Sequence, residues 1–367
     1  MSQIGIGIVG GGYMGKAHAV AYSAVGAVFA TRLRPVLEMV CASSDASAEA
    51  YRAQFGFKKA TSDWRVLVND PAVEAVVIAS PQSIHREIAL AAFEQGKPVF
   101  CEKPLGASLD DSRAMAAAAD ASGVANMVGF NYIRTPASQF ARQLLAEGRI
   151  GDVTCFRAEH TEDFLSDPAA PGNWRTEGRA NGNMGDLAPH IINGAHALMG
   201  PIAEINAMIQ TVHAERGGVP VTNDDQAQMM VRFESGVMGQ LFVSRIATGR
   251  KMGYAYQIDG THGAIRFDGE DQNAIWLYLR EGPEAEQGFR KILTGPAHPD
   301  YLPFCQGPGH GTGYQDQIII EAKDFLTAID TGQRVWPTFE EGMQANRVVA
   351  AAWASNDARA WVNIKDI

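Results

Sequence analysis

The chain has 367 residues, of which 46% are hydrophobic, and its 31 basic and 41 acidic side chains give a net charge of −10. This length is sufficient for two domains, and the composition is that of a globular protein with a substantial core. The acidic balance, without a local basic patch, disfavours a nucleic-acid partner because a phosphate backbone carries the same sign of charge.

The sequence gives no sign of export or of a membrane span. The first residues, MSQIGIGIVG, lack the basic flank and long apolar core of a signal peptide. No apolar run approaches the roughly 20 residues that cross a bilayer. The four cysteines are far apart and lack metal-ligand spacing. We therefore expect a cytoplasmic protein with free thiols, no membrane contact and no bound metal.

The first half of the chain alternates strand and helix patterns. A short buried strand is predicted at 4–9, and further apolar segments recur at 35–42, 74–80, 98–102 and 125–130. Between them lie helical patterns that each end on glycine, at 84–96 and 110–123. This alternation predicts an α/β fold in which helices cover both faces of a parallel sheet.

A glycine-rich stretch follows the first predicted strand and opens a helix. Gly10, Gly12 and Gly15 fit the pattern G-x-G-x-x-G in the strand–helix context that the motif requires. The first glycine makes the tight turn, the second lets the backbone approach a pyrophosphate, and the third allows close helix–strand packing. The stretch therefore predicts dinucleotide binding; a glycine-rich turn that serves packing alone is the alternative.

In dinucleotide-binding folds, a residue at the end of the second strand contacts the adenosine ribose. Ser43 stands where NAD-binding chains usually have an acid, and Asp45 follows two residues later. Small polar residues such as Ser43 and Ser44 suit a 2′-phosphate, but no arginine follows immediately. The coenzyme is predicted to be NAD or NADP, with a lean towards NAD.

The tripeptide Glu102-Lys103-Pro104 follows the strand predicted at 98–102. Ligands of open α/β sheets bind beyond the carboxyl ends of the strands. A residue before proline is restricted to extended geometry, so Lys103 is held in one direction. We predict that its ammonium group points to the nicotinamide end of the coenzyme; an ordinary solvated turn lysine is the alternative.

Four stretches together carry a family resemblance, and they read GIVGGGYMGKAHA, IASPQSIH, CEKP and GFNYIR. The whole chain, in order, resembles the glucose–fructose oxidoreductase/inositol dehydrogenase/MocA (Gfo/Idh/MocA) family. The resemblance implies an N-terminal Rossmann domain and a C-terminal α+β domain with a large, mainly antiparallel open sheet. It also implies oxidation or reduction of sugars and cyclitols with NAD(P), and a catalytic or substrate-positioning role for Lys103.

The segment GDLAPHII in the second half holds a second pair of candidate groups. A helix that begins near Asp186 would place Asp186 and His190 one turn apart on one face, with Leu187, Ile191 and Ile192 packing inward. The carboxylate would fix the tautomer of the ring and leave the other nitrogen to take a proton. The spacing matches the D-x-x-x-H motif of the family. The alternatives are a capping Asp186 with a core His190, or a shared metal, for which no third ligand has convincing spacing.

Other site residues come mainly from the resemblance. Trp174 and Arg175 match an aromatic–arginine pair that approaches the nicotinamide or the substrate in relatives, although a packed Trp174 with a solvated Arg175 is an equal alternative. His85 is expected to shape the coenzyme pocket rather than do chemistry. The predicted catalytic residues are Lys103, Asp186 and His190, and the predicted substrate-binding residues are these three with Tyr132 and Tyr314. The predicted coenzyme-binding residues are Gly10, Gly12, Tyr13, Met14, Gly15, Ser43, Ser80, His85, Glu102, Lys103, Asn131, Trp174 and Arg175.

From residue 202 onward, alternating segments predict sequential hairpins and a mainly antiparallel sheet. In 226–233, the residues that alternate onto one face are Ala227, Met229, Val231 and Phe233. Helices are expected to cover one face of the sheet, leaving the other for a second copy of the chain in a homodimer or homotetramer. The Gly- and Pro-rich residues 281–313 predict a long irregular connection. The domains are predicted as 1–132, Rossmann and NAD(P)-binding, and 133–367, substrate-binding and oligomerising.

These patterns predict an NAD(P)-dependent dehydrogenase acting on a secondary hydroxyl of a sugar, anhydrosugar or inositol-type cyclic polyol. Hydride passes to the nicotinamide while His190, oriented by Asp186, takes the hydroxyl proton and Lys103 holds the substrate oxygen. Two alternatives are weighed. One is an NAD-dependent glycoside hydrolase that oxidises its sugar transiently; the other is a non-catalytic NAD(P)-sensing regulator, whose mark would be the loss of Lys103 or His190.

Overall fold

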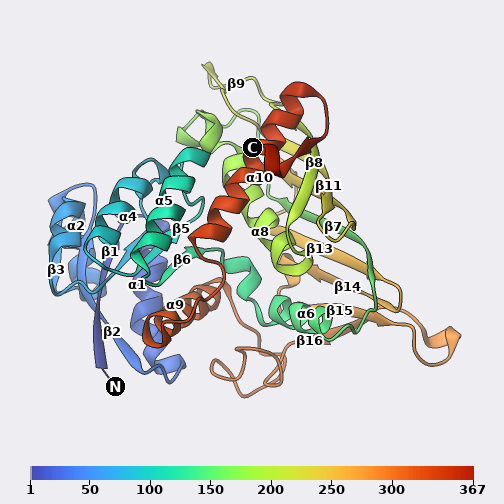
Figure 1. Cartoon of the computed structure of the whole chain (residues 1–367), viewed down its shortest axis with the longest axis horizontal. Helices are drawn as coiled ribbons and strands as arrows, with labels where there is room; N and C mark the ends of the chain where they lie inside the picture. Colours follow the sequence, from blue (N-terminus) through green and yellow to red (C-terminus); the bar gives the residue numbers. More distant parts are fainter. Residues whose placement is uncertain (1) are drawn as a thin grey trace. The chain divides into compact units, whose positions relative to one another are not determined.

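The computed structural model describes residues 2–367, which form two compact units (Figure 1). The first unit is the chain up to Arg134 together with Gly313–Asn346, and the second is Thr135–Thr312 together with Arg347–Ile367. The predicted boundary at 132/133 thus lies close to the first change of unit. The assignment of 133–367 to one continuous domain differs from the structure, because 313–346 pack with the first unit.

The first unit contains a six-stranded parallel sheet in the order β3-β2-β1-β4-β5-β6. The strands are β1 (Ser2–Val9), β2 (Leu33–Cys41), β3 (Lys59–Thr61), β4 (Ala75–Ile78), β5 (Val99–Glu102) and β6 (Asn126–Gly129). The strand order reverses between β1 and β4, and this is where doubly wound folds hold their ligands, beyond the carboxyl ends of the strands. The predicted parallel sheet is confirmed.

Helices cover both faces of this sheet. They are α1 (Tyr13–Val28), α2 (Asp45–Phe55), α3 (Trp64–Asn69), α4 (His85–Glu94), α5 (Leu109–Ser122) and α9 (Tyr314–Thr331), with short 3₁₀ turns η1 (Gln82–Ile84) and η2 (Asn131–Arg134). α1 packs on α9, and α4 packs on α5; the two pairs lie on opposite sides of the strands in Figure 1. α5 shows how local sequence sets these bounds: Ser108 caps its first turn, and Gly123 ends it with a φ of +65°.

The second unit is built on a nine-stranded sheet in the order β16-β15-β14-β13-β7-β12-β11-β8-β17, in which only the β7–β12 pair is parallel. The strands are β7 (Val153–Thr161), β8 (Ile202–Gln210), β11 (Gln226–Phe233), β12 (Met238–Ser244), β13 (Gly253–Gly260), β14 (Gly263–Asp268), β15 (Ala274–Leu279), β16 (Arg290–Leu293) and β17 (Val362–Asn363). The mainly antiparallel sheet is confirmed, and the four alternating residues of β11 are all buried, as predicted.

Helices pack on the buried face of this second sheet. α6 (Pro136–Ala146) contacts β14 and β15, and α8 (Ala188–Met199) contacts β7 and β12. A short α7 (Asn183–Asp186) precedes α8, and the division between the units falls within α10 (Phe339–Ala358). The connection predicted as irregular over 281–313 contains the edge strand β16, which pairs with β15, and the 3₁₀ turn η6 (Glu284–Glu286).

Two general features of the described residues bear on function. Between residues 2 and 367, no helix is both long enough and apolar enough to cross a bilayer. The same residues contain no group of three or more His, Cys, Asp or Glu side chains arranged to hold a metal ion. All four cysteines are free thiols.

Candidate active site

The glycine-rich turn between β1 and α1 is shaped by close backbone contacts. Gly10 has a φ of +132°, and a Cβ there would lie 2.2 Å from the carbonyl oxygen of Ala79. A Cβ on Gly15 would lie 2.0 Å from the carbonyl oxygen of Gly10, so neither position accepts a side chain. A Cβ on Gly12 would meet no atom within 4 Å, and Gly12 is the N-cap of α1. The turn therefore leaves open space at a helix N-terminus, which suits a pyrophosphate.

The carboxyl end of β2 presents hydroxyl groups. Ser44 is the N-cap of α2 and accepts a hydrogen bond from the backbone N–H of Ser47 at 3.2 Å. Ser43 is exposed just before this cap, and Asp45 lies in the first turn of the helix. A small hydroxyl therefore occupies the position where a carboxylate would select NAD, and the edge is compatible with NAD or NADP.

The end of β4 combines an orphaned polar atom with a buried histidine. The Oγ atom of Ser80 is buried and has no hydrogen-bond partner within residues 2–367. The ring of His85 is 1% exposed, with Nε2 2.9 Å from the carbonyl oxygen of Ser80. The predicted role of His85 in shaping the coenzyme pocket is compatible with this placement. The ring itself, however, is enclosed by protein.

Lys103 follows β5 in a turn whose other residues are buried. Every residue from Val99 to Gly106 is buried except Lys103, which is partly exposed. The carboxylate of Glu102 instead points inward, with Oε1 2.7 Å from Nε2 of the buried His18. The turn therefore presents the Lys103 side chain at the carboxyl edge of the sheet. Because the Glu102 carboxylate is engaged by His18, the coenzyme contact predicted for Glu102 would have to come through its backbone.

Three tyrosines from distant parts of the sequence gather beside the glycine-rich turn. Tyr13 is 70% exposed at the start of α1, and its ring stacks on Tyr314 with centroids 5.8 Å apart. Tyr132 lies 6.4 Å from Tyr314, whose hydroxyl donates to Sδ of Met14 at 3.3 Å. Burial raises the pKa of Tyr314 far above its ordinary range, so this hydroxyl stays protonated. Aromatic side chains of this kind are typical walls of small-molecule sites.

Asn131, the first residue of η2, was predicted to bind the coenzyme. Its amide nitrogen donates to Oε1 of Gln317 in α9 at 2.7 Å, and the residue is buried. The side chain thus ties the end of β6 to α9, inside the first unit. Its contact with a coenzyme stays a prediction.

In the second unit, Asp186 and His190 lie on two consecutive short helices. The helix predicted to begin near Asp186 begins at Asn183 and is interrupted at Leu187, because Pro189 has no N–H to donate to the carbonyl four residues earlier. Leu187 keeps helical dihedral angles (φ −92°, ψ −39°), so Asp186 and His190 remain one turn apart. The residues predicted to pack inward are buried, namely Leu187, Ile191 and Ile192.

A second histidine, which the sequence analysis missed, supports His190. The ring of His190 is 5% exposed and meets the ring of His160 edge to face at 5.4 Å. Nδ1 of His160 lies 3.1 Å from the carbonyl oxygen of Leu187, and Nε2 lies 3.3 Å from a carboxylate oxygen of Glu162. The alternation of VTCFRAEHT indicated only a strand. No local signal indicated that the His160 side chain would contact the backbone at Leu187.

Trp174 and Arg175 lie beside Asp186, in the 3₁₀ turn η3 (Trp174–Thr176). The Arg175 guanidinium sits 4.2 Å from the ring centroid of Trp174 and 5.7 Å from that of Phe164. Its Nε lies 3.7 Å from Oδ2 of Asp186, which makes an ion pair. Trp174 is 59% exposed, so it is not a packed core residue. The structure therefore brings these three predicted residues together.

A buried polar cluster at the start of β11 and the end of β12 holds the backbone of Arg175. Arg245 donates to the Arg175 carbonyl at 2.7 Å and pairs with Asp225 at 3.0 Å. Asn223 donates to the same carbonyl at 2.9 Å. Asp224 accepts a backbone N–H from the first turn of α7 at 2.8 Å, and burial raises the pKa of its carboxyl to about 6. The pattern TNDDQAQ could have signalled this cluster, since consecutive acids are unusual at the mouth of a buried strand.

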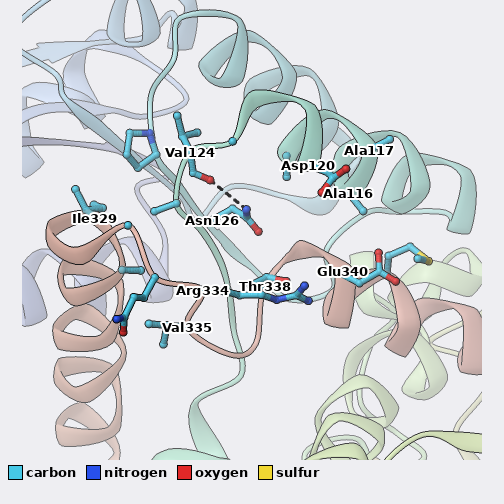
Figure 2. Close-up of a pocket in the computed structure, with 18 of the residues that line it drawn as sticks. Ala116, Ala117, Asp120, Val124, Asn126, Ile329, Arg334, Val335, Thr338 and Glu340 are labelled. Atoms are coloured by element: carbon cyan, nitrogen blue, oxygen red, sulfur yellow. Dashed lines mark hydrogen bonds between the residues drawn. The ribbon is translucent and has the colours of Figure 1, made fainter.

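A cavity of about 840 Å³ lies in the first unit (Figure 2). It borders Pro98 and Asn126, at the amino ends of β5 and β6, and is closed by parts of α5, α9 and α10. None of the predicted site residues lines it. Since ligands of parallel sheets bind at the carboxyl ends of the strands, this cavity is not the candidate active site.

The first unit fits a dinucleotide. The open space at Gly12, the orphaned Oγ of Ser80 and the reversal of strand order between β1 and β4 all lie along the carboxyl edge of the parallel sheet. With Lys103 on the same edge, these features define a Rossmann-type oxidoreductase with an added α+β unit.

The chain belongs to the Gfo/Idh/MocA family of oxidoreductases. Residues 4–130 match the model described as oxidoreductase family, NAD-binding Rossmann fold, and residues 138–266 match the model of the GFO/IDH/MocA C-terminal domain. The resemblance stated from the sequence is thus confirmed, and so is the NAD(P)-binding Rossmann fold.

Named relatives span the full chain. The levoglucosan dehydrogenase of Pseudarthrobacter phenanthrenivorans is 37% identical, with 100% of each chain covered. The inositol 2-dehydrogenase of Rhizobium meliloti is 26% identical, with 94% of each chain covered. A solved structure of levoglucosan dehydrogenase in complex with NADH and levoglucosan is 36% identical, covers 99% of this chain and 100% of its own, and superposes with a TM-score of 0.96.

Proposed function

We propose that the protein is an NAD(P)-dependent dehydrogenase that oxidises, reversibly, a secondary hydroxyl of a cyclic sugar, anhydrosugar or inositol-type polyol. The observation that carries this proposal is the full-length relationship to levoglucosan dehydrogenase, solved with NADH and levoglucosan. Lys103 at the carboxyl edge of the first sheet and the Asp186–His190 pair in the second unit supply groups for the chemistry. Lys103 and His190 belong to different units, and their action on one substrate is part of the proposal.

Each of these side chains has one task in the proposed reaction. The ring of His190 takes the proton of the substrate hydroxyl, and Asp186, beside Arg175, orients that ring. The ammonium group of Lys103 donates a hydrogen bond to the substrate oxygen and stabilises its developing negative charge. Tyr132 and Tyr314 contact the sugar ring. A bound nicotinamide coenzyme supplies the hydride acceptor.

The residues that would hold this coenzyme are those of the glycine-rich turn and the neighbouring strand ends. The backbone at Gly12 and the N-terminus of α1 face the pyrophosphate, and the Ser80 hydroxyl gains a partner. Ser43 reads the adenosine ribose and leaves NAD and NADP both acceptable. Trp174 and Arg175 are proposed to contribute from the second unit.

The proposal is tested by incubating the protein with levoglucosan, glucose, myo-inositol or scyllo-inositol and either NAD⁺ or NADP⁺, while the absorbance of the reduced nicotinamide is followed. We expect stoichiometric release of the reduced coenzyme with at least one of these polyols. No reduction with any polyol and either coenzyme would overturn the proposal. Cleavage of a glycoside without net reduction would instead establish the hydrolase alternative, which the named relatives do not favour.

We further propose that the protein acts in the cytoplasm as a homodimer or homotetramer, with copies meeting through the open face of the second sheet. Met208, Met230 and Met238 are 67%, 54% and 63% exposed. They lie on β8, β11 and β12, and β11 is paired with the other two strands. Met208 is opposite Gln228 and Met238 is opposite Arg232, so each lies on the face of its β11 partner. Gln228, Met230 and Arg232 alternate onto one face of β11, and the three methionines therefore share that face. Three exposed methionines on one sheet face are typical of a surface covered by another chain.

Replacement of Met230 by glutamate is expected to split this assembly into monomers, because each interface would then bury an unpaired carboxylate. Sedimentation velocity measures the mass. The control is Val66→Glu, at a residue of α3 that is 52% exposed in the first unit, and it should leave the mass unchanged. A wild-type protein that sediments as a monomer at micromolar concentration would contradict the proposed assembly.

A further inference from the structure

The buried ring of His85 joins two strand ends that the proposed reaction uses. On one side, Nε2 lies 2.9 Å from the carbonyl oxygen of Ser80, just after β4. On the other side, Nδ1 lies 3.2 Å from the carbonyl oxygens of both Pro104 and Leu105, just after β5. The ring therefore lies between the coenzyme loop and the turn that carries Lys103.

The His85 ring has a third neighbour at Nδ1. Sγ of Cys101, a fully buried residue of β5, lies 3.3 Å from Nδ1. Burial lowers the pKa of His85, so the ring is neutral and has a single N–H. Burial also raises the pKa of Cys101, so the thiol keeps its proton and can donate it. The Ser80 carbonyl oxygen makes the shortest of the ring's contacts, 2.9 Å from Nε2, so the ring proton is assigned to Nε2. The Cys101 S–H is then assigned to Nδ1 at 3.3 Å, ahead of its longer contact of 3.4 Å with the Glu102 carbonyl oxygen.

Glu102, the residue immediately before Lys103, is also held by a buried histidine. The Glu102 carboxylate, 2.7 Å from Nε2 of His18, is tied to α1. β6 accommodates it with a glycine, since a Cβ on Gly129 would lie 2.9 Å from its Oε1. Two buried histidines thus hold the end of β5 immediately before Lys103: His18 contacts Glu102, and His85 contacts Cys101. A side chain that must stabilise a developing charge gains from such a support, because misplacement by about 1 Å can cost roughly 100-fold in rate.

We propose that His85 is a positioning residue for Lys103, acting as the Nε2–H tautomer that accepts a hydrogen bond from the Cys101 thiol and ties β5, just before Lys103, to the end of β4. The expected effect on kcat rests on the proposed function. The expected tautomer of the His85 ring does not depend on any substrate. His85 touches neither the substrate nor the coenzyme in this role.

The kinetic test uses a matched pair at Cys101. Cys101→Ser keeps a hydrogen-bond donor to Nδ1, whereas Cys101→Ala removes it without adding charge or bulk. We expect kcat to fall about 10-fold in Cys101→Ala and to stay within about threefold of the wild type in Cys101→Ser, the loss corresponding to one hydrogen bond at the support of a reacting group. The dissociation constant of the coenzyme should change by less than about threefold in both. Equal kcat in the two variants, or a parallel loss of kcat and coenzyme affinity, would overturn the proposal.

A spectroscopic test needs no substrate and no turnover. The protein is labelled with ¹⁵N-histidine and saturated with NADH, and the ring signals of His85 are assigned by their absence in His85→Gln. We expect the Nε2–H tautomer, unchanged between pH 6 and 9 because burial lowers the pKa of this ring. An Nδ1–H tautomer, or titration within this range, would contradict the proposal. If the tautomer is as expected but no polyol is oxidised, the proposed function has failed and the structural role of His85 stands.

Discussion

Replacement of Lys103 by methionine is expected to lower kcat by about 10³-fold, within the range that removal of an electrostatic or proton-transferring group produces. Methionine keeps the length and apolar stem of the side chain and removes only the ammonium group. Lys103 is the one partly exposed residue between Val99 and Gly106, so the substitution leaves the buried turn in place. Steady-state kinetics with the best polyol give kcat, and quenching of protein fluorescence gives the affinity for the coenzyme.

The coenzyme affinity of this Lys103 variant should stay within about threefold of the wild type, because the pyrophosphate is held by the backbone of the glycine-rich turn. The control is Lys58→Met, at an exposed lysine of the first unit that pairs with the buried Glu38. It should leave kcat within about twofold, because Lys59 also lies near this carboxylate, at 3.6 Å. If the Lys103 variant lost coenzyme affinity and kcat to the same extent, Lys103 would be a coenzyme ligand rather than a catalytic group.

Replacement of His190 by glutamine is expected to lower kcat by about 10²- to 10⁴-fold, the usual contribution of a general base. The same change should abolish the rise of kcat/KM for alcohol oxidation that accompanies deprotonation of a histidine. Asp186→Asn should have a smaller effect of about 10- to 100-fold, because it leaves the base in place and removes only the carboxylate that orients it. A pH–rate profile of all three proteins, measured by coenzyme reduction, gives both quantities.

His262→Gln serves as the control in the second unit, because His262 is exposed and bonds only to its neighbour Thr261 through its side chain. Its pH profile should match that of the wild type. A His190 variant with an unchanged profile would assign His190 to the core, supported by His160, and would leave Lys103 as the sole proton-handling group of the proposed reaction.

The coenzyme half of the site could be predicted because its signals are local. The close backbone contacts at Gly10 and Gly15 exclude side chains at these positions. The three-glycine spacing is therefore a local signal for a strand, a tight turn and a helix that together bind a pyrophosphate. The placement of Lys103 at the carboxyl edge of the sheet could be predicted for a similar reason, since it directly follows a buried strand. In both cases the signal lies in residues that are neighbours in sequence.

The helix around Asp186 was predicted less well. The i, i+4 spacing of Asp186 and His190 was correct, but the effect of Pro189 on the preceding turn was not included, and the helix is interrupted at Leu187. The apolar residues packed inward as predicted, since their burial depends on helical periodicity, and this survives a break in a single hydrogen bond.

The sequence did not indicate that residues 313–346 pack with the first unit. The apolar face of α9 shows that the helix packs against something, but not which of two cores it joins. In the structure α9 packs on α1, and this brings Tyr314 to Tyr13 across some 300 residues of chain. The prediction that Tyr314 contacts substrate was made without that neighbour.

By itself, the sequence determined the fold class, the nucleotide-binding turn and the position of Lys103, because each depends on residues that are adjacent or one turn apart. Only the tertiary structure decided which side chains support them. Two such contacts join residues of different elements, His18 with Glu102 and His85 with Cys101. A buried imidazole bonds to the polar groups that packing places within hydrogen-bond distance, and its role depends on those groups.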